Sequence, residues 1–238
     1  IRVHPEAATG TAFVCYYSDG SRNFLFHVHH AAPGMLEPED VKPEKLAGSK
    51  WLHVSGFTMS VNQASAEAIY KMVETASPES KVCFDPNIRP EALSEEEIRK
   101  LCMPVIRRAD IIFPSKSEAA MLTGCATDEE GCRSWAADGK IVVLKNGDQG
   151  CRIYSGTEAF DVPGFSVEEV DPTGAGDTFC ACMINYVLDH GLADVTEESL
   201  KEMLTFANAA ASLVTTRKGA LRVMPTREEV EALIKERS

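Results

Sequence analysis

The sequence has no apolar run near the ~18 residues that a membrane-spanning helix needs, and its first residues, IRVHPEAATG, lack a signal-peptide core. Its eight cysteines form no CxxC pair, and several lie inside apolar runs such as KVCFD. We therefore expect reduced, mostly buried thiols in a cytoplasmic protein without a disulfide framework. No internal repeat, low-complexity tract or linker is present.

Positive charge is scarce, because 24 Lys and Arg residues face 36 Asp and Glu residues and give a net charge of −12. This balance disfavours nucleic acid and anionic membranes as partners. An acidic protein that handles an anionic substrate needs a local positive pocket, so Lys and Arg residues near glycines are the candidates to follow. The hydrophobic fraction of 44% is ordinary for a globular chain.

Two common catalytic motifs are also missing. The chain contains no GxSxG, and no cysteine has an obvious nucleophile setting, so a Ser or Cys hydrolase finds no support. The stretch DPTGAGDTF is not a Walker A loop, because no GK[ST] follows its glycines.

The pattern of elements predicts an α/β fold. Residues 11–18 and 23–29 read as a hairpin around Asp19-Gly20, the only clear antiparallel element. Strands and helices then alternate, with apolar strands such as KVCFD, DIIFPS and KIVVLK, and short strand candidates CRIYS and AFDVPG. This order predicts a mostly parallel sheet with helices on both faces. Pro104 predicts a break or kink in the helix over 93–109.

Small residues precede an acid in EVDPTGAGDTFCACM. If a helix begins near Ala175, its first amides are unpaired and carry the positive end of the helix dipole, which makes an anion site. Asp177 then lies beside a bound anion, where a base can take the proton of an attacking hydroxyl. The alternative is that Asp177 is only an acid in a first helical turn, stabilised by the dipole.

DPTGAGDTF resembles the C-terminal signature of the ribokinase-like (PfkB) family of carbohydrate kinases. FDPNIRP, FPSKSEAAMLTG, VVLKNGDQGC and NAAASLVTTRKGAL match further family segments in the family's order. FDPNIRP is similar to the 2-keto-3-deoxygluconate kinase and fructokinase branches. The resemblance implies a ribokinase-like α/β fold with a small β-hairpin lid, and ATP-dependent transfer of the γ-phosphate to a hydroxyl of a sugar or sugar acid, with Mg²⁺ and a monovalent cation such as K⁺ as cofactors.

Carried over by residue, the resemblance makes Asp177 the base, with Gly174, Ala175 and Gly176 as the anion hole. It places Arg89 where its planar fork can hold a phosphate or a substrate carboxylate. The other implied positions fall into a nucleotide group and a metal group. Those expected to bind the nucleotide are Ser115, Lys145, Gly147, Gly150 and Asn208. Those expected near metal ions are Glu118 for Mg²⁺ through water, and Asp171 and Thr173 for the monovalent cation. Plain surface roles for Arg89 and Glu118 stay open.

Three departures from the family bear on the substrate. Ser115 replaces a usual Asn, and His27 stands about where sugar-acid kinases carry Arg, which weighs against a sugar acid. We interpret the HxHH run from His27 as structural or substrate-facing rather than metal-binding. The chain also opens at the hairpin, so the family's preceding substrate region is expected to be missing.

We therefore expect a partial lid region at 1–36 and a nucleotide-binding kinase domain at 37–238. The function predicted is a carbohydrate kinase acting on a small sugar, with a homodimer through the lid as a candidate assembly. Two alternatives remain: a nucleoside kinase, or a non-catalytic nucleotide- or sugar-binding relic if the N-terminal substrate region is absent.

Overall fold

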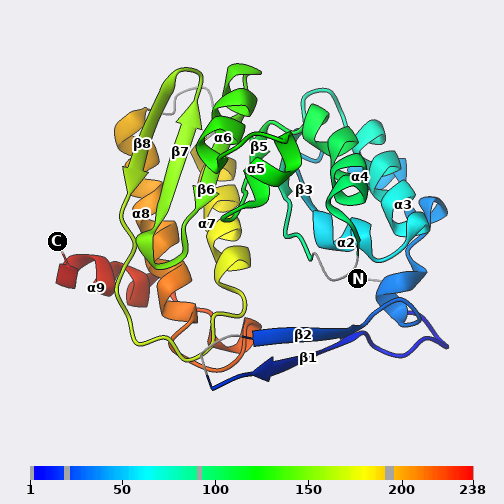
Figure 1. The fold of residues 1–238 in the computed structure, drawn as a ribbon, viewed down its shortest axis with the longest axis horizontal. Helices are drawn as coiled ribbons and strands as arrows, with labels where there is room; N and C mark the ends of the chain where they lie inside the picture. Colours follow the sequence, from blue (N-terminus) through cyan, green and yellow to red (C-terminus); the bar gives the residue numbers. More distant parts are fainter. Residues whose placement is uncertain (1–2, 19–21, 90–92, 191–195, 238) are drawn as a thin grey trace. The chain divides into compact units, whose positions relative to one another are not determined.

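The computed structural model describes residues 3–18, 22–89, 93–190 and 196–237, so the predicted Asp19-Gly20 turn lies outside the described residues (Figure 1). The chain forms two compact units, Ile1–Ala109 and Asp110–Ser238. Within the described residues, no helix is long and apolar enough to cross a membrane. All eight cysteines are free thiols, and five of them are buried, as the sequence predicted.

The first unit contains the predicted hairpin and a parallel strand pair. Strands β1 (Thr11–Tyr16) and β2 (Arg22–His27) pair antiparallel, while β3 (Trp51–Ser55) and β4 (Lys81–Asp85) pair parallel. The buried Val82, Cys83 and Phe84 form the apolar run of β4. The helical segments of this unit are η1 (Ala32–Met35), η2 (Pro38–Asp40), α1 (Pro43–Leu46), α2 (Gly56–Ser60), α3 (Gln63–Thr75) and α4 (Glu95–Arg108).

Helix α4 runs through Pro104 without interruption, so the predicted break is wrong. Proline removes the amide that would bond the carbonyl of Lys100. Both residues are exposed, and water can therefore hydrogen-bond to that carbonyl. A capping box between Ser94 and Glu97 closes the start of the helix.

The second unit has strands in the order β5-β6-β7-β8. Strand β5 (Ile111–Ile112) pairs parallel with β6 (Ile141–Lys145), but β7 (Cys151–Ser155) and β8 (Glu158–Val162) continue antiparallel, so the hairpin is not the only antiparallel element. Its helical segments are α5 (Glu118–Thr123), α6 (Asp128–Ala137), η3 (Gly147–Gln149), α7 (Ala175–His190), α8 (Glu197–Val214), η4 (Leu221–Val223) and α9 (Arg227–Arg237).

Helices cover both faces of strand β7. Alternate side chains of a strand point to opposite faces, so Tyr154 and Cys151 show which helix lies on each face. Tyr154 lies on the face of α6, with the Arg133 guanidinium 5.6 Å from its ring centroid. Cys151 lies on the other face and accepts a contact from the amide of Asn208 on α8. The predicted covering of the sheet on both faces is thus found in this unit.

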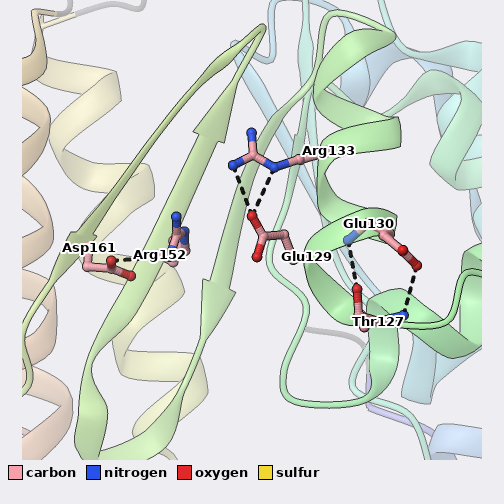
Figure 2. Close-up of polar contacts among 6 residues, drawn as sticks. All are labelled: Thr127, Glu129, Glu130, Arg133, Arg152 and Asp161. Atoms are coloured by element: carbon pink, nitrogen blue, oxygen red, sulfur yellow. Dashed lines mark hydrogen bonds and ion pairs between the residues drawn. The ribbon is translucent and has the colours of Figure 1, made fainter.

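Figure 2 shows polar contacts at the surface of α6 and of the β7–β8 pair. The Thr127 hydroxyl and the Glu130 carboxylate exchange hydrogen bonds with each other's backbone amides at the start of α6. Arg133 pairs with Glu129 one turn away at 2.9 Å, and an exposed pair of this kind contributes only about 0.3–0.5 kcal/mol. Burial of the apolar faces therefore dominates the stability of the unit.

Candidate active site

The DPTGAGDTF stretch forms a turn that leads directly into α7, which begins at Ala175. Gly174 has φ +87°, a conformation that only glycine adopts readily. The amide of Thr178 bonds the carbonyl of Gly174 at 2.9 Å and closes the first helical turn. Within the described part of the chain, the amides of Gly176 and Asp177 have no hydrogen-bond acceptor, so they are available to an anion.

Asp177 is the third residue of α7, and its side chain is exposed. An acid in the first turn is favoured by the helix dipole. An exposed carboxylate beside unpaired amides can also meet a substrate hydroxyl, so this position is compatible with both interpretations made from the sequence.

Asp171 anchors this turn to the loop after α8. Its Oδ1 accepts from the amide of Thr173 at 3.0 Å, and its Oδ2 accepts from the amide of Gly219 at 3.1 Å. The amides of Val170 and Asp171 both donate to the carbonyl of Thr215, at 2.8 and 2.9 Å. Asp171 is 8% exposed, so a buried carboxylate fixes the entry to α7.

Lys145 brings a positive charge to the same helix end. A methyl group placed on Gly176 would lie 3.5 Å from Lys145 Nζ, so the ammonium group lies directly beside the start of α7. The amide of Lys145 bonds the carbonyl of Pro114 at 2.8 Å, and Lys145 bridges Ser115 in parallel register. The end of β6 therefore brings Ser115 and Lys145 together.

Ser115 and Glu118 form a compact turn before α5. The amide of Ser115 donates to Glu118 Oε2 at 2.7 Å, and the amide of Glu118 donates to the carbonyl of Ser115. Glu118 is only 9% exposed. Ser117 between them has φ +73°. Asp128 holds this strained segment, because its two oxygens accept from the amides of Ser117 and Ala120 at 2.6 and 2.9 Å.

A cavity of about 650 Å³ opens beside Lys145 and the start of α7, within the range typical of small-molecule sites. Gly150, at φ +91°, closes one wall so tightly that a methyl group there would lie 2.2 Å from the carbonyl oxygen of Val162. Four of the five predicted nucleotide residues line it, namely Lys145, Gly147, Gly150 and Asn208, whereas Ser115 does not; Ala175 and Gly176 line it as well. Further lining residues include Gln149, Gly164, Phe165, Pro172, Phe179, Ala211, Ser212 and Thr215.

Asn208 forms part of the cavity wall and also supports it. Its Nδ2 donates to the carbonyls of Val162 and Pro163, each at 3.1 Å, and contacts Cys151 Sγ at 3.7 Å. Burial raises the pKa of the Cys151 thiol to about 12, although the Asn208 hydrogen bond acts in the opposite direction. A thiol with that pKa is protonated at neutral pH and is a poor nucleophile, which gives a Cys hydrolase no support either.

The first unit supplies Arg89, which follows β4. Asn87 has φ +40°, and its amide donates to Asp85 Oδ1 at 3.2 Å. The guanidinium carbon of Arg89 lies 5.7 Å from the ring centroid of Phe24 and 5.9 Å from that of Phe57. Arg89 belongs to the first unit, whereas Asp177 belongs to the second.

Two observations bear on metal binding. His29 Nδ1 hydrogen-bonds with the carbonyl of Val61, which gives the HxHH run a structural contact. No group of three or more His, Cys, Asp or Glu residues that could hold a metal ion occurs among the described residues.

Three features escaped the sequence analysis. The Asp128 clamp and the rings around Arg89 depend on contacts between distant residues, for which the sequence carries no signal. Gly164 could have been suspected from the PG dipeptide after β8: a methyl group there would lie 2.3 Å from the carbonyl oxygen of Asp148.

Comparison with known proteins places this geometry in a family. Residues 1–227 match the family model described as pfkB family carbohydrate kinase. Fructokinase-2 of Oryza sativa subsp. japonica is 33% identical over 232 residues, which cover 96% of this chain and 69% of that protein. Fructokinase-2 of Solanum lycopersicum is 32% identical, over 96% of this chain and 71% of that protein.

Solved structures agree. A protein from E. coli provisionally assigned as ribokinase II, in complex with ATP and Mg²⁺, has a TM-score of 0.86 and 33% identity, over 98% of this chain and 72% of that one. The fructokinase of Xylella fastidiosa with bound ATP has a TM-score of 0.84 and 26% identity, over 98% and 76%.

These matches confirm the predicted ribokinase-like α/β fold and the predicted ATP-dependent sugar kinase activity, and they do not favour the nucleoside kinase or the non-catalytic relic. The chain belongs to the pfkB family of carbohydrate kinases.

Proposed function

We propose that the chain transfers the γ-phosphate of ATP to a hydroxyl of fructose, with Asp177 as the general base. The fructokinase names of its relatives support the sugar, and a structural neighbour from Vibrio cholerae holds fructose, ADP and a calcium ion. One observation carries the mechanism: the unpaired amides of Gly176 and Asp177 and the Lys145 ammonium group lie together at the start of α7, where the cavity opens, and Asp177 is an exposed residue of the same helical turn.

The cavity residues fit a bound polyphosphate. In a protein of net charge −12, the Lys145 ammonium beside Gly176 and the dipole of α7 supply a local positive field. The amides of Gly176 and Asp177 donate to the phosphoryl oxygens and stabilise negative charge as the phosphoryl group moves. Gly147 and Gly150 allow the backbone to approach the nucleotide closely.

Asp177 acts on the acceptor. Its carboxylate takes the proton of the attacking hydroxyl as the new oxygen–phosphorus bond forms and the bond to ADP breaks. Because Asp177 lies in the first turn, its carboxylate is beside the free amides rather than between them. The carboxylate can therefore act on the acceptor hydroxyl while the amides bind the phosphoryl oxygens. Because fructose is uncharged, the anionic group left for Arg89 to hold is a phosphate.

Glu118 suits Mg²⁺ chemically, because a hard cation prefers carboxylate oxygens and retains several waters. When bound, Mg²⁺ neutralises the charge of the ATP phosphates. We assign Ser115 to the same region, since its amide already orients the Glu118 carboxylate at 2.7 Å. A monovalent cation at the Asp171–Thr173 turn stays a prediction, supported by the potassium ion bound in a related fructokinase structure.

A homodimer through the lid also stays a prediction. Phe13 and Leu25 are opposite each other in the hairpin and are 59% and 66% exposed, which gives one face an apolar surface. A measured molar mass of a single chain in solution would contradict it.

The base assignment is tested with Asp177→Asn. The variant should bind ATP with unchanged affinity, because the amides and Lys145 remain, while kcat falls roughly 10²–10⁴-fold through loss of the proton acceptor. Asp189→Asn, which removes an exposed acid from the same helix, is the matched control and should leave both unchanged. Turnover of Asp177→Asn within a few-fold of wild type would refute the assignment.

The substrate is tested in a panel of fructose, other ketoses, 2-keto-3-deoxy sugar acids and nucleosides, with ADP release as the readout. The highest kcat/KM is expected for fructose. If a 2-keto-3-deoxy sugar acid has the highest kcat/KM, fructose is wrong and the substrate is that of the 2-keto-3-deoxygluconate kinase branch. Phosphorylation of nucleosides alone would overturn the proposed sugar kinase.

A further inference from the structure

The Arg89 side chain lies against two of three aromatic rings that pack together in the first unit. Phe24 and Phe26 of β2 stack at 5.6 Å with an interplanar angle of 7°, and Phe26 meets Phe57 of α2 at 4.9 Å and 46°. We call Phe24, Phe26 and Phe57 the aromatic cluster. Arg89 touches its two outer members, with distances of 5.7 and 5.9 Å from the guanidinium carbon to the ring centroids.

Hydrogen bonds fix this guanidinium only in part. Its Nη1 donates to the carbonyl of the preceding Ile88 at 3.0 Å. Its Nε is buried and has no hydrogen-bond partner among the described residues. A flexible arginine held by one contact to its own neighbour loses considerable side-chain entropy when it binds an anion.

Aromatic faces can supply the missing restraint. A guanidinium group stacks on rings through cation–π attraction, and this contact occupies its flat face rather than its N–H donors. The donors therefore remain directed at the edge of the group, where a phosphate or carboxylate binds in a bidentate manner.

We propose that Phe24 and Phe57 are positioning residues for Arg89: their rings orient its guanidinium for the anionic group that it holds during phosphoryl transfer. The inference rests on the role proposed for Arg89 above. It also gives the hairpin a part in the reaction, because Phe24 comes from a lid strand.

The test is a double-mutant cycle measured as kcat/KM with the best sugar. Phe24→Leu keeps an apolar side chain but removes the ring, and we expect about a fivefold loss, which corresponds to about 1 kcal/mol. Phe57→Leu should lose a similar amount. Phe24→Tyr keeps the ring face and should retain activity close to wild type.

The measurement that distinguishes positioning from a merely structural role is kcat/KM in the Arg89→Ala background, because a residue that acts through Arg89 can have no effect once Arg89 is removed. There, Phe24→Leu should cause no further loss. Tyr17→Leu, which removes a 53% exposed ring just after β1, is the matched control and should have no effect in either background.

Two outcomes overturn this inference while leaving the proposed function intact: a full fivefold loss from Phe24→Leu in the Arg89→Ala background, or no loss in the wild-type background while Arg89→Ala is impaired. If Arg89→Ala itself retains full kcat/KM, the role of Arg89 in the proposed function fails, and this inference fails with it. If Phe24→Leu does not fold, the same cycle with Phe57→Leu and Phe57→Tyr decides the question.

Discussion

The clearest prediction concerns Gly176, because a substitution there separates binding from folding. Gly176 is the second residue of α7 and is not among the glycines with positive φ. An added methyl group would meet only Lys145 Nζ, at an ordinary contact distance of 3.5 Å. Valine at this position should therefore fold, and its side chain would occupy the space between the Lys145 ammonium group and the helix amides.

The expected loss can be worked from the contacts at stake. A hydrogen bond to a charged group contributes about 1.5–3 kcal/mol, so displacing one phosphate contact should weaken ATP binding roughly 10- to 100-fold. Stability should change by less than about 1 kcal/mol, the usual difference between glycine and a helix-forming residue. Gly176→Ala should give a smaller loss of affinity in the same direction.

Isothermal titration with ATP and Mg²⁺ measures the affinity, and a thermal melt of the free protein measures the stability. Ala181→Val, which adds the same branched side chain on the exposed face of α7, is the matched control and should leave ATP binding unchanged. Gly176→Val with wild-type affinity would refute the placement of the phosphates at this helix end. Gly174 does not permit this experiment, because its φ of +87° makes any substitution strained.

Two further predictions concern stability. Asn208→Ala should lower the free energy of unfolding by about 1–3 kcal/mol, because it removes the donor to the backbone carbonyls of the buried Val162 and of Pro163; an unchanged denaturant midpoint would contradict that support role. Burial raises the pKa of the Cys132 and Cys151 thiols from 9.0 to about 12. As pH rises from 9 toward 12, these thiols therefore ionise in the unfolded chain before they do so in the folded one, and the free energy of unfolding should fall, by about 1 kcal/mol per thiol at pH 10. Cys132→Ala should flatten this decline in melting temperature, and an unchanged slope would contradict the assignment.

Local signals explain which elements could be predicted. Helix α5 ends at Gly124, which adopts φ +78°, as expected of a glycine after the last helical residue. Helices α3, α4 and α8 begin at Asn or Ser/Thr caps that precede apolar stripes. Where the cap, the period and the end signal agree, sequence and structure differ by only a few residues.

The errors arise where a short segment depends on its tertiary partners. Helix α2 follows β3 directly, and its five residues carry too few positions for a helical period to be read. Strands β7 and β8 carry no sign of direction; their antiparallel pairing follows from the short connections on either side, which leave no room for a crossover. Helix α4 tolerates Pro104 only because that residue faces solvent, which periodicity around it could have suggested.

In the candidate site, too, the features set by local sequence could be predicted, and those set by contacts between distant residues could not. Many of the residues that line the cavity come from two continuous motifs, KNGDQG and DPTGAGDTF, in which Lys145 and the glycines are close in sequence to the turns that place them. The supports depend on distant partners: Asp128 clamps the Ser115–Glu118 turn from the next helix, and Asp171, although it opens the DPTGAGDTF motif, accepts from Gly219, which lies 48 residues along the chain. A motif therefore indicates which groups meet the phosphates, whereas the contacts by which Asp128 and Asp171 fix those groups become visible only in the fold. Because Asp128 and Asp171 hold the backbone amides in place, substituting either residue should slow the reaction, although neither contacts the substrate. Substitutions at the phosphate-binding residues alone therefore cannot measure how much of the rate depends on this preorganisation.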